Sequence, residues 1–66
     1  MTYDEVQEGQ TVRIMTRTPK YRINGVVWAK EKITAGERTV ERVYVDTERP
    51  RSRRLCHPSI LEPVNG

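Results

Sequence analysis

The chain has 66 residues, enough for one domain, and a domain of this size buries only about 60% of the surface of its unfolded chain. Its single cysteine excludes an internal disulfide, and one cysteine with one histidine cannot supply the roughly four ligands of a structural zinc site. No apolar run is long enough to span a membrane. We therefore expect a small soluble domain without a metal or other cofactor, for which assembly into a homo-oligomer would add buried area.

The positive charges are concentrated in the middle of the chain. Residues 1–8 contain three acids and no base, whereas residues 9–58 contain all twelve lysines and arginines against five acids, although the net charge of the chain is only +3. Four of the nine arginines lie within residues 49–54. The planar fork of arginine suits phosphate and carboxylate groups, so this distribution favours an anionic partner. The acidic start differs from a secretory signal peptide, and the lack of disulfides fits a reducing cytoplasm.

The first strand is predicted over residues 11–17. Apolar and polar residues alternate there, which places Val12 and Ile14 on the same face. A turn precedes this strand, and Val6 is expected to pack inward ahead of that turn. Pro19 ends the strand, because proline cannot donate a hydrogen bond to a ladder.

The Asn24-Gly25 pair allows two interpretations. It is the strongest short signal for a hairpin, which would join residues 21–23 to residues 26–28. Alternatively, Gly25 is a bulge or a point of close backbone approach at the start of one longer strand. We prefer the second interpretation, with residues 18–24 as a loop, because the first leaves a strand of only three residues.

The residues after Gly25 alternate between the two faces of this strand. Val26 and Trp28 share one face, and Val27 and Ala29 share the other. Because a small core needs a large side chain, we expect Trp28 to fill it.

The second half of the chain is expected to be extended as well. Residues 38–46 are rich in β-branched and aromatic residues, with Val43 and Val45 on one face and Val40 and Tyr44 on the other. A turn at residues 35–37 precedes this strand, and a charged loop at residues 47–51 follows it. We then expect a short strand at residues 53–57, a 3₁₀ turn at residues 58–61 and a last short strand at residues 62–64.

These elements predict an all-β fold. No segment repeats apolar residues at helical spacing, whereas short strands separated by turns are typical of a barrel or a sandwich. At this length a small barrel is favoured, because closure removes the exposed strand edges. We expect a five-stranded barrel that forms a single domain over residues 1–66, with its core between about residues 6 and 64.

Four stretches carry a distinctive order of strands and turns, namely residues 9–14 (GQTVRI), 25–28 (GVVW), 43–46 (VYVD) and 54–64 (RLCHPSILEPV). In this order the chain resembles the SH3-like barrels of bacteria, phages and mobile elements, above all KOW-type modules and the C-terminal domain of retroviral-type integrases. The resemblance implies a five-stranded barrel with a short 3₁₀ turn before the last strand, and a nucleic-acid or protein partner. Gly25 matches the glycine that precedes the second strand of KOW motifs. Arg53 and Arg54 match, in kind only, the basic residues near the end of integrase C-terminal domains.

The basic residues and aromatic rings suggest a nucleic-acid-binding site. Trp28 and Tyr44 could also stack on a base, but Tyr21 lies in the predicted loop and is the best stacking candidate. Without a recognition helix for the major groove, we expect weak sequence preference on DNA or RNA. The residues expected to contact phosphate are Arg13, Arg17, Arg22, Arg49, Arg51, Arg53 and Arg54.

A protein-interaction module is the alternative. Five acids are interspersed among the bases of residues 9–58, and they would repel phosphates. In this interpretation the chain is a phage or plasmid accessory protein that docks on an acidic surface of a host protein, and the arginines of residues 49–54 belong to that interface or only keep an exposed hairpin tip soluble.

Catalysis is not expected from this sequence. Cys56 and His57 are the only residues that could suggest a thiolate–imidazole pair, but adjacent side chains of a strand point to opposite faces. We therefore expect one of them to be packed and the other to lie at the rim. No catalytic residue and no metal ligand is predicted.

Overall fold

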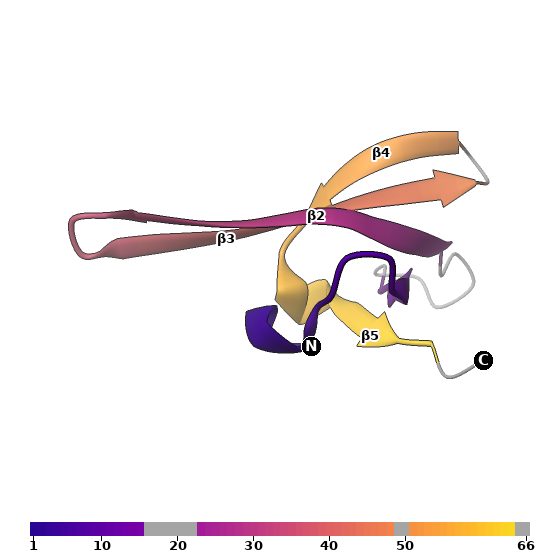
Figure 1. Cartoon of the computed structure of the whole chain (residues 1–66), viewed down its shortest axis with the longest axis horizontal. Coiled ribbons are helices and arrows are strands. Elements are labelled where there is room, and N and C mark those ends of the chain that lie inside the picture. Colours follow the sequence, from indigo (N-terminus) through magenta and orange to yellow (C-terminus); the bar gives the residue numbers. More distant parts are fainter. Residues whose placement is uncertain (16–22, 49–50, 65–66) are drawn as a thin grey trace.

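The computed structural model describes residues 1–15, 23–48 and 51–64. These residues form one sheet of five antiparallel strands in the order β4-β3-β2-β1-β5 (Figure 1). The strands are β1 (Thr11–Ile14), β2 (Ile23–Ala35), β3 (Arg38–Glu48), β4 (Arg51–Cys56) and β5 (Leu61–Pro63), and two 3₁₀ turns are η1 (Tyr3–Glu5) and η3 (Pro58–Ile60). The all-β expectation is confirmed, including the 3₁₀ turn before the last strand, whereas η1 was not expected. Within the described residues, no helix has the length and apolar character needed to cross a membrane.

The core lies on one side of this sheet. Alternation is confirmed in β1, where Val12 and Ile14 are buried, and in β3, where Val43 and Val45 are buried. The remaining members of the buried apolar cluster are Val6, Val27, Cys56 and Leu61. The interior is therefore filled by side chains of modest size. We call the side of the sheet that faces away from this core the outer face.

Gly25 lies inside β2 and not in a hairpin turn. A Cβ at this position would lie 2.5 Å from Val45 Cγ1 and 2.7 Å from the carbonyl oxygen of Asp46, so the neighbouring strand approaches as closely as glycine permits. The expectation of a close approach in one longer strand is confirmed. The strand begins at Ile23, so the predicted loop over residues 18–24 was too long at this end, and its residues 18–22 lie outside the described part of the chain.

Trp28 is not in the core, which contradicts the expectation. Its side chain is 43% exposed, whereas Val27 beside it is fully buried, and neighbouring residues of a strand cannot both point inward. The pairing of β2 with β3 then shifts between Val27 and Ala29. Because of this bulge, Ala29 pairs with Tyr44 and leaves the face of Val27, where the alternation had placed it.

The β2–β3 hairpin extends far beyond the body of the molecule (Figure 1). Its ladder continues to the pair Ala35–Arg38, and Gly36 forms the expected turn with a φ of +62°. Residues 31–40 are all exposed. We call these ten residues the arm. Strand structure over residues 30–34 was not expected.

The sheet is strongly curled although it is open. The edge strands β4 and β5 are joined only by residues 57–60, most of which form η3. A flat sheet would separate its two edges by about 19 Å, whereas a connection of this length with a 3₁₀ turn spans about 13 Å. The two edges must therefore come together at this end, although no ladder joins β4 to β5 among the described residues.

Candidate nucleic-acid interface

The outer face of β2, β3 and β4 exposes a group of large apolar and aromatic side chains. Val26 and Trp28 of β2 are nearly half exposed, Leu55 of β4 is 58% exposed, and Tyr44 of β3 lies between them with partial exposure. The register of the ladders brings them together, because Tyr44 pairs with Leu55 and the bulge sets Trp28 beside Tyr44. The two rings lie 5.4 Å apart between centroids at an angle of 45°.

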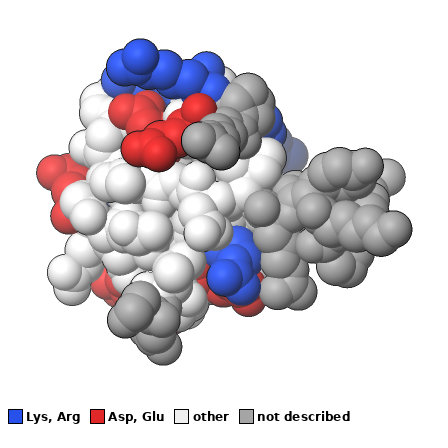
Figure 2. Space-filling view, turned by 90° about the vertical axis from the view of Figure 1, so that its right-hand side faces the viewer, with Lys and Arg blue, Asp and Glu red and all other residues white. Residues whose placement is uncertain are grey.

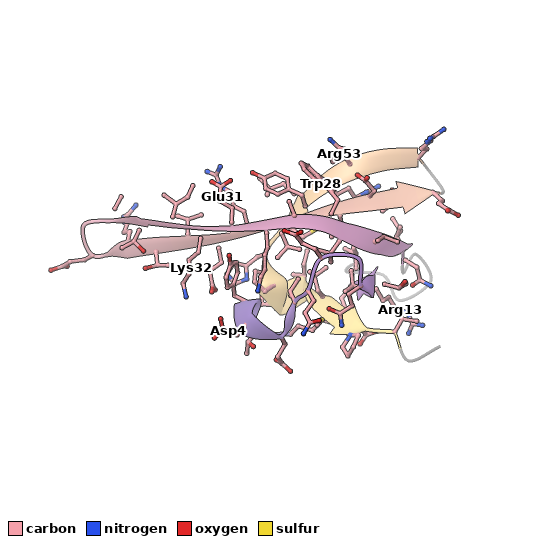
Figure 3. The ribbon with its side chains drawn as sticks, in the orientation of Figure 1. Asp4, Arg13, Trp28, Glu31, Lys32 and Arg53 are labelled. Carbon is pink, nitrogen blue, oxygen red and sulfur yellow. The ribbon has the colours of Figure 1, made fainter. Side chains whose placement is uncertain are left out.

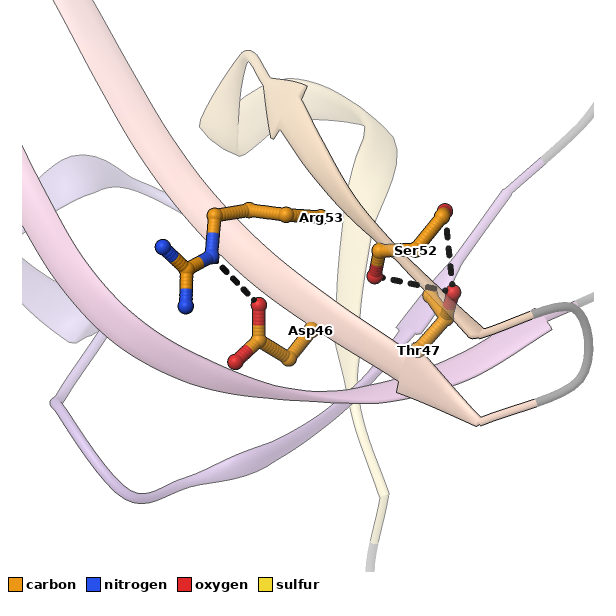
Figure 4. Close-up of polar contacts among 4 residues, drawn as sticks. All are labelled: Asp46, Thr47, Ser52 and Arg53. Carbon is orange, nitrogen blue, oxygen red and sulfur yellow. Dashed lines mark hydrogen bonds and ion pairs between the residues drawn. The ribbon is translucent and has the colours of Figure 1, made fainter.

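Arg53 lies over the Trp28 ring of this aromatic pair. Its guanidinium carbon is 4.2 Å from the centroid of the Trp28 ring, a cation–π arrangement. Its Nε donates a hydrogen bond of 2.9 Å to Asp46 Oδ1 (Figure 4), and this bond raises the pKa of Arg53 above its ordinary value. Asp46 and Arg53 are direct cross-strand partners, so the ladder itself fixes the arginine over the ring.

An open hollow of about 760 Å³ lies next to this cluster, where β3 ends and β4 begins. Asp46, Glu48, Arg51 and Arg53 contribute two charges of each sign to its lining, which also includes Val26, Thr47 and Ser52. Thr47 Oγ1 donates to the carbonyl oxygen of Ser52 at 3.2 Å and lies 3.3 Å from Ser52 Oγ (Figure 4). These contacts join β3 to β4 beneath the hollow.

The arginines of β4 do not all serve this surface. Arg51 and Arg53 alternate onto the outer face, whereas Arg54 pairs with the buried residue Val45 and is only partly exposed. The buried Nε atom of Arg54 has no hydrogen-bond partner among the described residues. Half of the expected cluster therefore lies outside this face or cannot be placed on it.

The other predicted residues are placed separately. Arg13 of β1 is separated from β4 by the two strands β2 and β3. It lies on the other side of the ribbon in Figure 3 and forms an ion pair of 3.3 Å with Glu62. Figure 2 likewise shows basic side chains in separate groups with acidic ones beside them. Arg17, Arg22, Arg49 and Tyr21 lie outside the described residues.

A second charged cluster lies on the inner side of the hairpin, where the arm leaves the body. Lys30 Nζ is 4.5 Å and Lys32 Nζ 5.3 Å from the centroid of the Tyr3 ring, and Lys30 also donates to the carbonyl oxygen of Tyr3 at 3.1 Å. Glu41 lies 3.8 Å from Lys32 Nζ and 3.9 Å from His57 Nε2. These contacts tie η1 to the base of the arm, so both lysines have local partners.

Cys56 and His57 are separated as expected. Cys56 is buried and His57 is exposed, and His57 Nδ1 instead accepts a hydrogen bond of 3.1 Å from the backbone nitrogen of Ser59 at the start of η3. Burial raises the pKa of the Cys56 thiol, which disfavours the thiolate. In the described part of the chain, no three histidine, cysteine, aspartate or glutamate side chains form a group that could hold a metal ion.

Three of the residues that build this surface, Trp28, Tyr44 and Asp46, were not among the predicted site residues, although both rings had been considered as stacking candidates. The signal for Trp28 was its position next to Val27 in a strand with one buried face. Asp46 could have been found only from its pairing with Arg53. Searches of protein families, of curated proteins and of solved structures find no match to the chain.

Proposed function

We propose that the chain is a small nucleic-acid-binding module and that the outer face of β2–β4 binds a single strand of DNA or RNA with weak sequence preference. The observation that carries this proposal is the exposed Trp28 ring, with Arg53 over it and Tyr44 beside it. Stacking platforms for unpaired bases combine aromatic rings with arginine in this way. This mode of binding reads unpaired bases on a sheet face, so it does not require a recognition helix that enters the major groove of a duplex.

Each side chain has a distinct part in this proposal. A base stacks on the Trp28–Arg53 pair, since a guanidinium plane accepts a base as an aromatic ring does. Arg51, which is exposed at the rim of the hollow, contacts the neighbouring phosphate. Asp46 already neutralises part of the charge of Arg53, so the binding energy comes more from stacking than from phosphate contacts.

The finer fold assignment is part of the same proposal. We assign the curled sheet to the SH3-like small barrels, in which the strand after a 3₁₀ turn closes the sheet. The support is the strand order β4-β3-β2-β1-β5 together with the short η3 connection between its two edges.

The test uses the fluorescence of Trp28, the only tryptophan of the chain. We expect single-stranded oligonucleotides to quench this fluorescence and expect affinity to fall with salt, by a slope of about −0.7 for each phosphate neutralised on a single strand. Arg51→Ala should make that salt dependence shallower by the slope of one phosphate contact. Trp28→Ala, followed by anisotropy of a labelled oligonucleotide, should weaken binding by about 1–3 kcal/mol.

Asp46→Asn is the sharpest variant, because it should strengthen binding. Removal of the carboxylate frees the charge of Arg53 to contact a phosphate. The salt dependence of binding should then steepen by the slope of about one phosphate contact. Arg38→Ala at the tip of the arm is the matched control for Arg51→Ala, because it also removes one arginine. It should leave both the salt slope and the affinity for oligonucleotides nearly unchanged. Absence of any salt-sensitive binding or quenching at low ionic strength would rule out the proposal.

A protein partner is the second candidate, and the composition of the hollow favours it. Its lining carries equal numbers of acidic and basic side chains, and tryptophan, tyrosine and arginine are the residues most enriched at the energetic centres of protein interfaces. In that case Trp28→Ala should abolish capture of a protein from host lysate, Asp46→Asn should weaken it, and oligonucleotides should not compete.

A further inference from the structure

The arm exposes one apolar cross-strand pair, Ile33 with Val40, between charged rows of its outer face. On its outer face, Ile33 pairs with Val40 and Glu31 with Arg42, and the next row toward the body is Ala29 with Tyr44. On the inner face, Lys32 pairs with Glu41 and Thr34 with Thr39. The inner face of the arm is thus polar, whereas the outer face combines the apolar pair with charged residues, to which the pair Ala35–Arg38 adds one more charge.

Nothing in the described part of the chain covers this apolar pair. Ile33 is 37% and Val40 46% exposed, although a two-stranded hairpin in water is marginally stable unless its apolar face is packed. Seven large apolar residues are exposed in the described chain, against eight apolar residues in the core. The apolar pair of the arm is therefore left open to a partner.

The geometry points to a second copy of this chain as that partner, packed face to face on the outer face of the arm. Sheets pack in this way about 10 Å apart with their strands nearly aligned. A twofold axis along the arm places β2 of each copy over β3 of the other. Ile33 then faces the second copy's Val40, and Ala29 faces the second copy's Tyr44. Because Tyr44 also lies beside Trp28, the dimer and a bound strand would compete for this part of the outer face.

Charge complementarity selects this occupant and this orientation. Neither Glu31 nor Arg42 forms an ion pair or a side-chain hydrogen bond with any described residue, although the two are cross-strand neighbours. With the axis along the arm, each Glu31 faces Arg42 of the second copy. An axis perpendicular to the arm would set β2 over β2, and centred on this row it would place Glu31 against Glu31. A nucleic acid would meet the carboxylate of Glu31 without a compensating partner.

The test measures mass against concentration by analytical ultracentrifugation. Because the interface is at the small end of specific interfaces, we expect the wild-type protein to shift from monomer to dimer between about 10 and 500 μM. Glu31→Arg and Arg42→Glu each place like charges opposite one another at both ends of the row, so each variant alone should raise the dimer Kd at least tenfold. Circular dichroism verifies that both variants remain folded.

Mixing the two variants is the decisive arm of the experiment. In the mixed dimer every arginine of one copy faces a glutamate of the other, so dimerisation should return. General attraction cannot explain that result, because both variants keep a positive net charge from the wild-type value of +3. In a Cys56→Ser background, Ile33→Cys protein mixed with Val40→Cys protein should form a disulfide-linked dimer faster than either alone.

Four outcomes would overturn the inference. They are a wild-type protein that stays monomeric over the whole range, single variants that dimerise normally, a mixture that fails to recover the dimer, and cysteine variants that cross-link no faster when mixed. Loss of oligonucleotide binding in the arm variants without a change of mass would assign the arm to the nucleic acid instead.

Discussion

Gly25 leaves no room for a larger side chain. An added Cβ would overlap Val45 Cγ1 and the Asp46 carbonyl oxygen, and the second of these is backbone that cannot rotate away. Gly25→Ala should therefore destabilise the protein by about 1–3 kcal/mol, the usual cost of overpacking. The measurement is the free energy of unfolding in urea.

Gly36→Asn provides the matched control for that substitution. Gly36 has a positive φ of 62°, but no atom lies within 4 Å of an added Cβ, and asparagine visits this region of backbone space more readily than other side chains. Its free energy of unfolding should stay close to that of the wild type. Equal losses of stability in the two variants would contradict the role of contact with β3 at Gly25.

Single residues also show what alternation could and could not predict. Val12 and Ile14 were assigned correctly because the core face of a short regular strand repeats every second residue. Trp28 was assigned wrongly because its size favoured the core, while its neighbour Val27 already occupied that face. The bulge that then carries Ala29 to the face of Tyr44 depends on the register with β3, which the residues of β2 do not specify.

At the scale of elements, η1 is fastened to the base of the arm by the ring of Tyr3. Lys30 and Lys32 both lie over that ring, and exposed cation–π contacts contribute about 0.5–1 kcal/mol each. Tyr3→Ala should therefore lower the free energy of unfolding by about 1–2 kcal/mol and should speed amide exchange in β2 around Lys30.

Tyr3→Phe separates the ring from its hydroxyl. It keeps the aromatic face and the backbone carbonyl that accepts from Lys30, so both stability and amide exchange should remain near the wild-type values. If Tyr3→Ala left exchange in β2 unchanged, the contact between η1 and the arm would have no part in holding the arm in position.

The elements were easier to predict than their extents. All five strands were expected, since β1, β2 and β3 contain β-branched residues beside turn signals and β4 and β5 flank the predicted 3₁₀ turn. The second half of β2 was not, because the ladder over residues 30–34 is held by backbone hydrogen bonds between residues that are mostly polar and exposed. The same limit applies to the candidate interface. The arginines of β4 were visible in the sequence, but their division between two faces follows from the register with β3.

At the scale of the whole molecule, burial of the Cys56 thiol links stability to pH. Burial raises the pKa of this thiol in the folded protein, so the folded state holds its proton at pH values where the unfolded state releases it. Stability should be unaffected below the unfolded pKa of about 8.5 and should fall as the pH rises from there toward the folded pKa.

The comparison with Cys56→Ala isolates this effect from the ionisation of lysine and tyrosine. The melting temperature of the variant should fall less steeply than that of the wild type between about pH 8.5 and pH 10, although the variant starts lower because it loses buried contacts. The wild-type thiol should also react slowly with a disulfide reagent at neutral pH. Parallel curves for the two proteins would contradict the assigned pKa direction.

The position of β1 in the sheet sets the order in which the structure can assemble. Its two neighbours come from opposite parts of the chain, since Thr11 pairs with Val26 and Val12 pairs with Pro63, about fifty residues further along. The β2–β3 hairpin closes through a turn of two residues and can form within microseconds, whereas the pairing of β1 with β5 must first close a loop of almost the entire chain. During synthesis, therefore, the long hairpin can be present while β1 still has one open edge, and that edge stays available to wrong partners until β5 has left the ribosome.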